Sequence, residues 1–137
     1  MKFKNIWKNV EEPLEYHEDS RGKIVDLFYK NNIEHVAYIT RKKGSIGGNH
    51  YHKYTTQICL IVKGTMKYWY KPLDEPNTES KFIILKEGDM VEAPPFEIHA
   101  MEFPEEEDNA FICFAYGARG GKDYESDTFR VDSIILN

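Results

Sequence analysis

Hydrophobic residues recur along this chain in short β-prone runs, and the period of an amphipathic helix is hard to find. The runs are rich in β-branched and aromatic residues and are separated by Gly, Pro, Asn and charged clusters. The pattern predicts strands at about Lys23–Tyr29, His35–Arg41, Asn49–His52, Thr56–Lys63, Thr65–Lys71, Lys81–Lys86, Met90–Ala93, His99–Phe103, Ala110–Tyr116 and Asp127–Leu136. Lys63-Gly64-Thr65 has the composition of a tight hairpin turn between two of these strands.

So many short strands in a small chain predict an all-β fold, a closed or double-sheet antiparallel barrel. Only closure or a second sheet removes that many strand edges. No internal repeat or second domain is visible, so we expect one domain over residues 1–137 with its barrel core at about 23–116. We expect the N- and C-terminal strands to lie at a homodimer interface, since Ile6 and Trp7 would otherwise be exposed.

Composition narrows the classes of partner. The chain has 137 residues, 14% of them aromatic, which suits packing on pleated sheets. Its net charge of −5 at pH 7, without a basic stripe, argues against nucleic acid or an anionic membrane as the main partner.

The sequence shows neither a membrane-spanning run nor a signal peptide. Cys59 and Cys113 lie in apolar runs, as buried free thiols of a reducing compartment do, although a disulfide or thiolate ligand is an alternative. We therefore expect a cytoplasmic protein.

Histidines provide the strongest chemical signal. His50 and His52 are two residues apart, so on a strand both imidazoles point to the same face. His99 begins another predicted strand after a Pro-rich turn. Three of the five histidines thus fall in one pattern, which predicts a divalent-metal site, whereas His17 and His35 have no such partners.

Strand alternation indicates which side chains accompany these histidines. If His50 and His52 face the interior, the next strand can turn Gln57, Cys59 and Ile61 to the same side. On the later strand His99, Met101 and Phe103 share one face. Three imidazoles and the Gln57 carboxamide oxygen can therefore converge in an apolar cavity and hold a Zn, Fe, Mn or Ni ion, with positions left open for water or substrate.

The spacing of these residues resembles the two motifs of the cupin superfamily. The first motif, G-x5-HxH-x3–4-E-x6-G, is matched by Gly44, His50, His52, Gln57 and Gly64, with Gln in place of Glu. The second, G-x5-PxG-x2-H-x3-N, is matched by Gly88, Pro94 and His99, with Phe96 in place of Gly and Phe103 in place of Asn. The resemblance implies a single-domain cupin jelly-roll β-barrel whose metal is carried by His50, His52, Gln57 and His99. The neutral amide would be a weaker ligand than a carboxylate.

A narrower resemblance concerns the nucleotide-sugar cupins. Asp19-Ser-Arg21-Gly22 is similar to the D-x-R-G stretch of dTDP-4-dehydrorhamnose 3,5-epimerases and dTDP-keto-sugar 3,4-ketoisomerases. Gly48-Asn-His50-Tyr-His52-Lys53 is similar to the ketoisomerase segment RGxHxHK, with Gly47 where Arg is expected. The chain length and the tail from Lys122 to Thr128 also resemble that group, and the GNHYH run is similar to the cupin domain of certain capsule-biosynthesis reductases.

This second resemblance implies enolisation of a keto-sugar. In those families a His of this strand, here His50 or His52, is the general base, and an acid such as Tyr70, or alternatively Tyr68, acts on the other side. Arg21 and Lys53 would bind the phosphates of a nucleotide-sugar substrate. Those enzymes typically work without metal, and an imidazole bound to metal has no lone pair left to accept a proton. The metal site and the base role of His50 and His52 therefore exclude each other.

Three functions are compatible with these patterns. The first is an isomerase or epimerase of a keto-sugar or nucleotide-sugar in surface-polysaccharide biosynthesis, which the D-x-R-G stretch favours. The second is an Fe(II)-dependent cupin dioxygenase, since a neutral set of three His and one Gln can bind Fe(II). The third is a non-catalytic sugar-binding accessory module, in keeping with Gln for Glu and Phe103 for Asn.

Overall fold

The computed structural model describes residues 1–117 and 125–137, and within these residues all regular secondary structure is strand. The described residues contain no helix that is long and apolar enough to cross a membrane. The strands are β1 (Lys2–Asn5), β2 (Tyr16–Asp19), β3 (Gly22–Val25), β4 (His35–Arg41), β5 (Ile46–Tyr51), β6 (Thr56–Lys63), β7 (Met66–Pro72), β8 (Lys81–Leu85), β9 (Asp89–Ala93), β10 (Glu97–Glu102), β11 (Asn109–Tyr116) and β12 (Phe129–Arg130).

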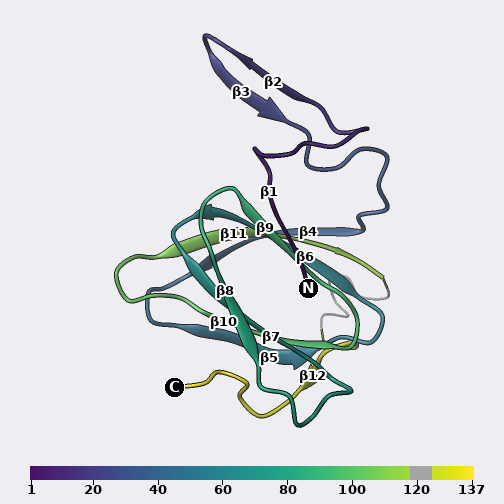
Figure 1. Ribbon diagram of the computed structural model, residues 1–137, viewed down its shortest axis with the longest axis vertical. Helices are drawn as coiled ribbons and strands as arrows, with labels where there is room; N and C mark the ends of the chain where they lie inside the picture. Colours follow the sequence, from purple (N-terminus) through teal and green to yellow (C-terminus); the bar gives the residue numbers. More distant parts are fainter. Residues whose placement is uncertain (118–124) are drawn as a thin grey trace.

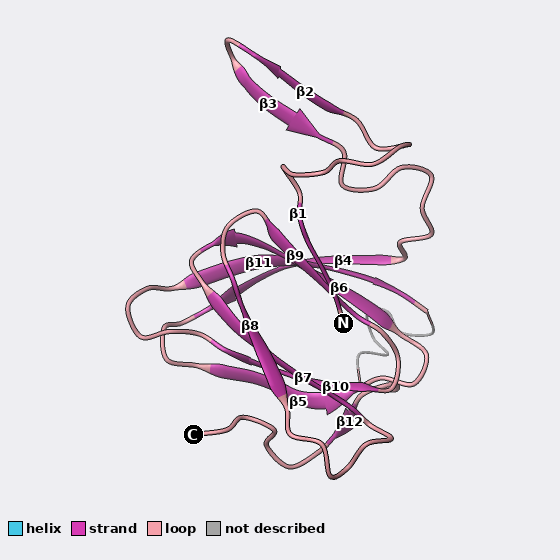
Figure 2. Cartoon of the chain, in the orientation of Figure 1, coloured by secondary structure: helices cyan, strands magenta, loops and turns pink. Residues whose placement is uncertain are grey.

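Two five-stranded antiparallel sheets face each other (Figures 1 and 2). The first has the strand order β1-β9-β6-β11-β4 and the second β12-β5-β10-β7-β8. A separate hairpin of β2 and β3 projects from one end of this double layer (Figure 1). The all-β jelly-roll prediction is confirmed in its double-sheet form, because the two sheets are not closed into a continuous barrel.

The strand predictions are accurate in the centre of the chain and poor at its ends. β4 and β6 have the predicted bounds, and Gly64 lies in the predicted hairpin turn between β6 and β7. β1 and β2 were not predicted, because their sequences, KFKN and YHED, carry few apolar residues. The strand predicted at Lys23–Tyr29 ends at Val25, and the one predicted at Asp127–Leu136 contains only β12.

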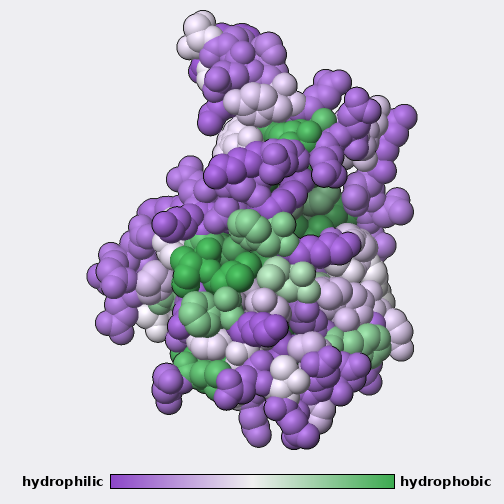
Figure 3. Space-filling view, in the orientation of Figure 1, coloured by the Kyte–Doolittle hydropathy of each residue, from purple (hydrophilic) through white to green (hydrophobic). Residues whose placement is uncertain are grey.

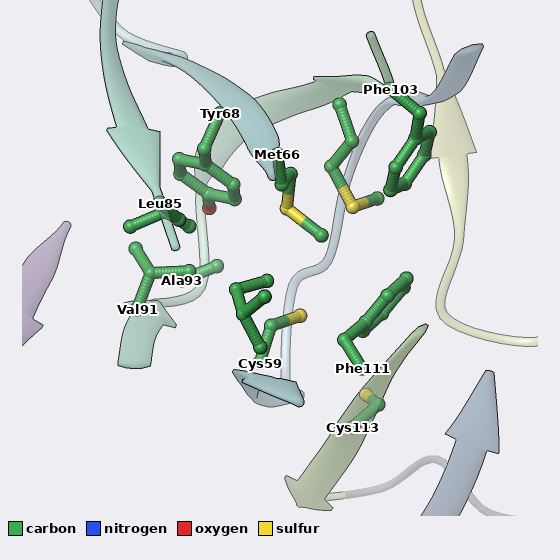
Figure 4. Packing of buried hydrophobic residues seen from close by; sticks show 11 residues of the cluster. Cys59, Met66, Tyr68, Leu85, Val91, Ala93, Phe103, Phe111 and Cys113 are labelled. Carbon is green, nitrogen blue, oxygen red and sulfur yellow. The ribbon is translucent and has the colours of Figure 1, made fainter. Parts of the chain in front are cut away.

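The main hydrophobic core lies between the two sheets (Figure 4). Alternation along β6 explains its composition: Cys59 and Ile61 point into this core, whereas Ile58 and Leu60 belong to a second cluster on the outer face of the same sheet. Because both faces of β6 are covered, its sequence is an almost continuous apolar run. The buried members of the inner cluster are Cys59, Ile61, Met66, Tyr68, Leu85, Val91, Ala93, Met101, Phe103, Phe111 and Cys113.

The outer face of the second sheet retains exposed apolar side chains. Phe82 and Ile84 of β8 are exposed, and their cross-strand partners on β7 are Trp69 and Lys67. The Lys67 ammonium lies 4.1 Å from the Phe82 ring centroid and 4.6 Å from that of Trp69, a cation–π arrangement that covers part of this face. Figure 3 shows a hydrophobic patch in the region where Figure 1 places β8, surrounded by polar surface.

Candidate metal centre

The fold brings together His50, His52 and His99, which are far apart in sequence. His50 lies on β5, His52 directly follows that strand, and His99 lies on β10 opposite His50. One ring nitrogen from each histidine can be chosen so that all three lie within 4.8 Å of one another. The three residues are 7%, 3% and 1% exposed. A buried group of three imidazoles at this spacing has the composition of a divalent-metal site.

A β-bulge sets the position of His50. His99 pairs with His50, but the next residue on β10, Ala100, pairs with Gly48, so Asn49 is an extra residue on β5. Gly48 and Asn49 both have positive φ, +80° and 56°. A Cβ atom on Gly48 would lie only 2.7 Å from the His99 carbonyl oxygen. Only glycine therefore permits the close approach of β5 and β10 beside the histidines.

Hydrogen bonds fix the orientation of the His52 ring and determine which ring nitrogen carries the proton. Its Nδ1 lies 2.7 Å from the backbone carbonyl oxygen of Asp127, which can only accept, so Nδ1 is the donor. The Asp127 carboxylate in turn accepts the backbone N–H groups of Lys53, Tyr54 and Thr55 at 2.8–2.9 Å. Although burial opposes it, these hydrogen bonds lower the pKa of Asp127 below its usual value. Asp127 thus holds the turn that follows His52.

The remaining donor atoms fit a bound cation. With Nδ1 protonated, the Nε2 lone pair of His52 points to the Gln57 carboxamide oxygen 3.3 Å away, so two acceptors face each other. Neither ring nitrogen of His99 makes a hydrogen bond of normal geometry with the described residues, although the side chain is buried. Burial, followed by the neighbouring His50 and His52, lowers the pKa of His99 well below its usual value, which keeps the imidazole neutral. A divalent ion would bind these imidazole nitrogens and the amide oxygen, and would supply the partner that their lone pairs lack.

A cavity of about 280 Å³ opens beside this cluster. Its wall is formed mainly by the inward-facing residues of β4 and by the histidines. The lining residues are His35, Ala37, Ile39, Arg41, Gly48, His50, His52, Gln57, Met101, Phe111 and Cys113. The wall therefore combines an apolar surface with a few convergent polar groups, as small-molecule sites do.

Residues 17–129 match the family described as the polysaccharide biosynthesis C-terminal domain. The chain belongs to this family. None of the curated proteins matches the sequence. The fold is similar to that of many solved structures, three of which are described below. These likenesses confirm the predicted cupin-like jelly roll.

The first is the capsular polysaccharide assembling protein CapF of Staphylococcus aureus, with a TM-score of 0.65 at 20% identity over 88% of this chain. The chain spans only 35% of the length of that protein. The second is the sugar 3,4-ketoisomerase QdtA of Thermoanaerobacterium thermosaccharolyticum, solved with TDP, with a TM-score of 0.68 at 22% identity over 87% of this chain and 85% of that one. The third is the dTDP-4-dehydrorhamnose 3,5-epimerase of Sulfolobus tokodaii, with a TM-score of 0.70 at 19% identity over 90% of this chain and 85% of that one.

Register resolves which tyrosines of this family member turn inward. Tyr70 pairs with His99 across β7 and β10, and Tyr68 pairs with Met101, so both side chains face the space between the sheets. The Tyr68 ring stacks on that of His99 with centroids 6.0 Å apart. Burial, followed by the charges of Cys59 and Glu97, raises the pKa of Tyr68 well above its usual value. Neither tyrosine lines the cavity, so the predicted acid role of Tyr70 lacks a direct path to a ligand there.

The structure does not bring Arg21 and Lys53 to the cavity. Arg21 lies at the tip of the projecting β2–β3 hairpin, where its side chain is 85% exposed and pairs with Asp19 at 2.7 Å (Figure 1). The D-x-R-G stretch forms this local ion pair, which lowers the pKa of Asp19. The Lys53 ammonium lies over the Phe129 ring, 4.3 Å from its centroid. The part of the tail resemblance at residues 122–124 lies outside the described residues.

Sequence reasoning missed two polar residues of the cavity wall, His35 and Arg41. They begin and end β4, and the alternation of that strand turns both inward. The Nδ1 atom of His35 is buried without a hydrogen-bond partner among the described residues. The Arg41 side chain passes beside Gly47, and no carboxylate in the described part of the chain lies within ion-pair distance of it. The HVAYITR alternation was the available signal, since it places residues 35 and 41 on one face.

Proposed function

We propose that this protein is a metal-dependent isomerase or epimerase that enolises a nucleotide-linked keto-sugar in surface-polysaccharide biosynthesis. The observation that carries the proposal is the buried cluster of His50, His52 and His99, with the Gln57 oxygen beside it. His50, His52 and Gln57 line a cavity of about 280 Å³. Membership of a polysaccharide-biosynthesis family supports the pathway. The printed names of similar structures, a sugar 3,4-ketoisomerase and a 3,5-epimerase, support the reaction class.

The residues proposed to hold the ion are His50, His52, His99 and Gln57. When bound, a Zn, Fe, Mn or Ni ion would polarise the carbonyl of the keto-sugar as a Lewis acid. His99 contributes a neutral imidazole, because burial and the neighbouring His50 and His52 lower its pKa and disfavour its protonation. It also excludes bulk water from the cluster, since all three histidines are at least nine-tenths buried.

His35 is the proposed proton-transfer residue, because ligand histidines have no free lone pair for a base. On the first sheet, His35 pairs with Ala115, which pairs with Gln57, so the three form one row across β4, β11 and β6. Strands lie ~4.8 Å apart, which places the His35 and Gln57 backbones ~10 Å from each other. The small side chain of Ala115 between them leaves room for a ligand.

The His35 imidazole would take a proton from the carbon next to the sugar carbonyl, and the electron pair of that C–H bond would form an enolate. To shift the ketone, the imidazolium would return the proton to the former carbonyl carbon, while the hydroxyl proton on the deprotonated carbon passes to the former carbonyl oxygen. To epimerise, solvent would add a proton to the opposite face of the deprotonated carbon, and the imidazolium would release its own proton to solvent. In both cases every proton removed is replaced, so the product is an isomer of the substrate. Arg41, six residues along the same strand and ~20 Å away, would bind the anionic nucleotide diphosphate, which suits an elongated substrate.

Solvent exchange tests the proposal directly. The protein is incubated in deuterated water with a panel of dTDP-, UDP- and GDP-linked keto-sugars, and the ring protons are followed by NMR. We expect deuterium to enter next to the carbonyl of one substrate, and His35→Ala to slow the exchange by about 100-fold or more. His17→Ala, on the exposed hairpin, is the matched control. Tight binding of a sugar nucleotide, with no deuterium entering the ring of any keto-sugar in the panel, would contradict an isomerase and indicate a sugar-binding module.

A further inference from the structure

The orientation of the Gln57 carboxamide decides what it offers to the histidine cluster. Its two ends are almost the same shape, but only the oxygen has a lone pair suited to a metal ion. In the structure the oxygen faces Nε2 of His52 at 3.3 Å, and the amide nitrogen donates to the Cys113 sulfur at 3.0 Å. The neighbour that accepts the N–H group therefore determines which end points at the histidines.

Cys113 is well placed for this role. It lies on β11 in the cavity wall, two residues before Ala115 and therefore on the same face of the sheet as Gln57, and is 2% exposed. Directly opposite on β6 is Cys59, whose thiol hydrogen-bonds to Cys113. Figure 4 shows the two cysteines on neighbouring strands, both turned into the core. The sulfur that receives the Gln57 amide is thus held in place by the packing of the core.

We infer that Cys113 is a positioning residue of the metal site, which orients Gln57 so that the carboxamide oxygen faces the cation. The inference rests on the proposed metal site. Without the sulfur acceptor, the carboxamide can rotate and turn its N–H₂ group toward the ion. The positive end of that group repels a cation. The residues that orient a metal ligand typically change metal affinity by about 10- to 100-fold when removed.

A cobalt titration of the metal-free protein, followed by visible absorbance, tests this role. We expect Cys113→Ala to weaken Co²⁺ binding by about 10-fold or more, and Cys113→Ser, which keeps an acceptor, to bind like the unsubstituted protein. Cys59→Ala is the matched control: it removes a buried thiol from the same pair but leaves the contact between Gln57 and Cys113. Circular dichroism confirms that each variant folds, and Cys113→Val replaces Cys113→Ala if the latter does not.

A second background separates orientation of Gln57 from general packing. In Gln57→Glu both ends of the side chain are oxygens, so no N–H acceptor is needed, and adding Cys113→Ala should change the Co²⁺ affinity by less than about twofold. An unchanged affinity of Cys113→Ala alone, or an equal loss in the Gln57→Glu background, would overturn the role of Cys113. Failure of the unsubstituted protein to bind Co²⁺ would instead overturn the proposed metal site together with this role.

Discussion

His50 and His99 lie directly opposite each other on β5 and β10, with ring centroids 4.7 Å apart and ring planes at 86°. The pairing changes register immediately beyond them, where Asn49 bulges out of β5. Backbone hydrogen bonding fixes the bulge, since the Asn49 carbonyl and side-chain oxygens accept the N–H groups of Val131 and Ile134. The geometry of the candidate metal site therefore depends on a local departure from regular strand pairing.

This dependence predicts that Gly48→Ala disrupts both stability and metal binding. The new Cβ would lie 2.7 Å from the His99 carbonyl oxygen, at a residue whose φ is +80°. We expect a loss of about 2 kcal/mol or more in the free energy of unfolding, with weaker metal retention. Urea denaturation and elemental analysis measure the two effects. Gly47→Ala is the control, because its nearest contacts would be ordinary ones at 3.7 and 3.9 Å. Equal behaviour of the two variants would contradict the role of the bulge.

Arg41, rather than Arg21, is predicted to bind the anionic part of the ligand. Loss of a charge-assisted hydrogen bond costs about 1.5–3 kcal/mol, so Arg41→Gln should weaken binding of the active sugar nucleotide by roughly 10- to 100-fold. Arg21→Gln should leave it unchanged, since that side chain is 85% exposed on the projecting hairpin. Calorimetry with the substrate found by solvent exchange provides both values. If Arg21→Gln alone weakens binding, the hairpin must reach a cavity in another copy of the chain.

The lowered pKa of Asp127 predicts that the stability of the protein depends on pH. Its pKa is lowered in the folded protein relative to the ordinary value of 3.8, so its stabilising contribution is complete above that value and disappears as the pH falls through the folded-state pKa. Asp127→Asn should lower the free energy of unfolding by about 1–3 kcal/mol at neutral pH, because three backbone N–H donors lose a charged acceptor. The difference from the unsubstituted protein should shrink below about pH 4.

Urea denaturation at neutral pH and at about pH 3 measures this change. Asp74→Asn, in an exposed loop, is the control and should have little effect at either pH. A difference between Asp127→Asn and the unsubstituted protein that stays constant with pH would show that the carboxylate charge is not what stabilises the turn.

The sequence was informative wherever a strand is covered on at least one face. β4 shows clear alternation and β6 a continuous apolar run, and both were predicted with their observed bounds. β1 is an edge strand whose lysines face solvent, and it pairs with residues of β9 that lie 84 to 90 positions further along the chain. Such pairing leaves no local pattern, so it could not be predicted.

In the candidate site, too, patterns within one strand were predictive and the pairing between strands was not. The histidines and Gln57 follow from spacing and alternation within single strands. His35 was interpreted as an isolated histidine, because its place in the row with Ala115 and Gln57 depends on the register of three strands. Arg21 has the expected motif around it, but the hairpin that carries it projects away from the double sheet (Figure 1). The homodimer expected from the terminal strands stays a prediction.

Metal content measured by elemental analysis, on protein purified without chelators or metal-affinity resin, tests the central claim most directly. The account predicts about one equivalent of a transition metal per chain, and loss of that metal in His99→Ala but not in His17→Ala, whose side chain is 67% exposed on the β2–β3 hairpin. Metal-free protein that also fails to take up Zn²⁺, Mn²⁺, Fe²⁺ or Ni²⁺, or full occupancy in His99→Ala, would contradict it.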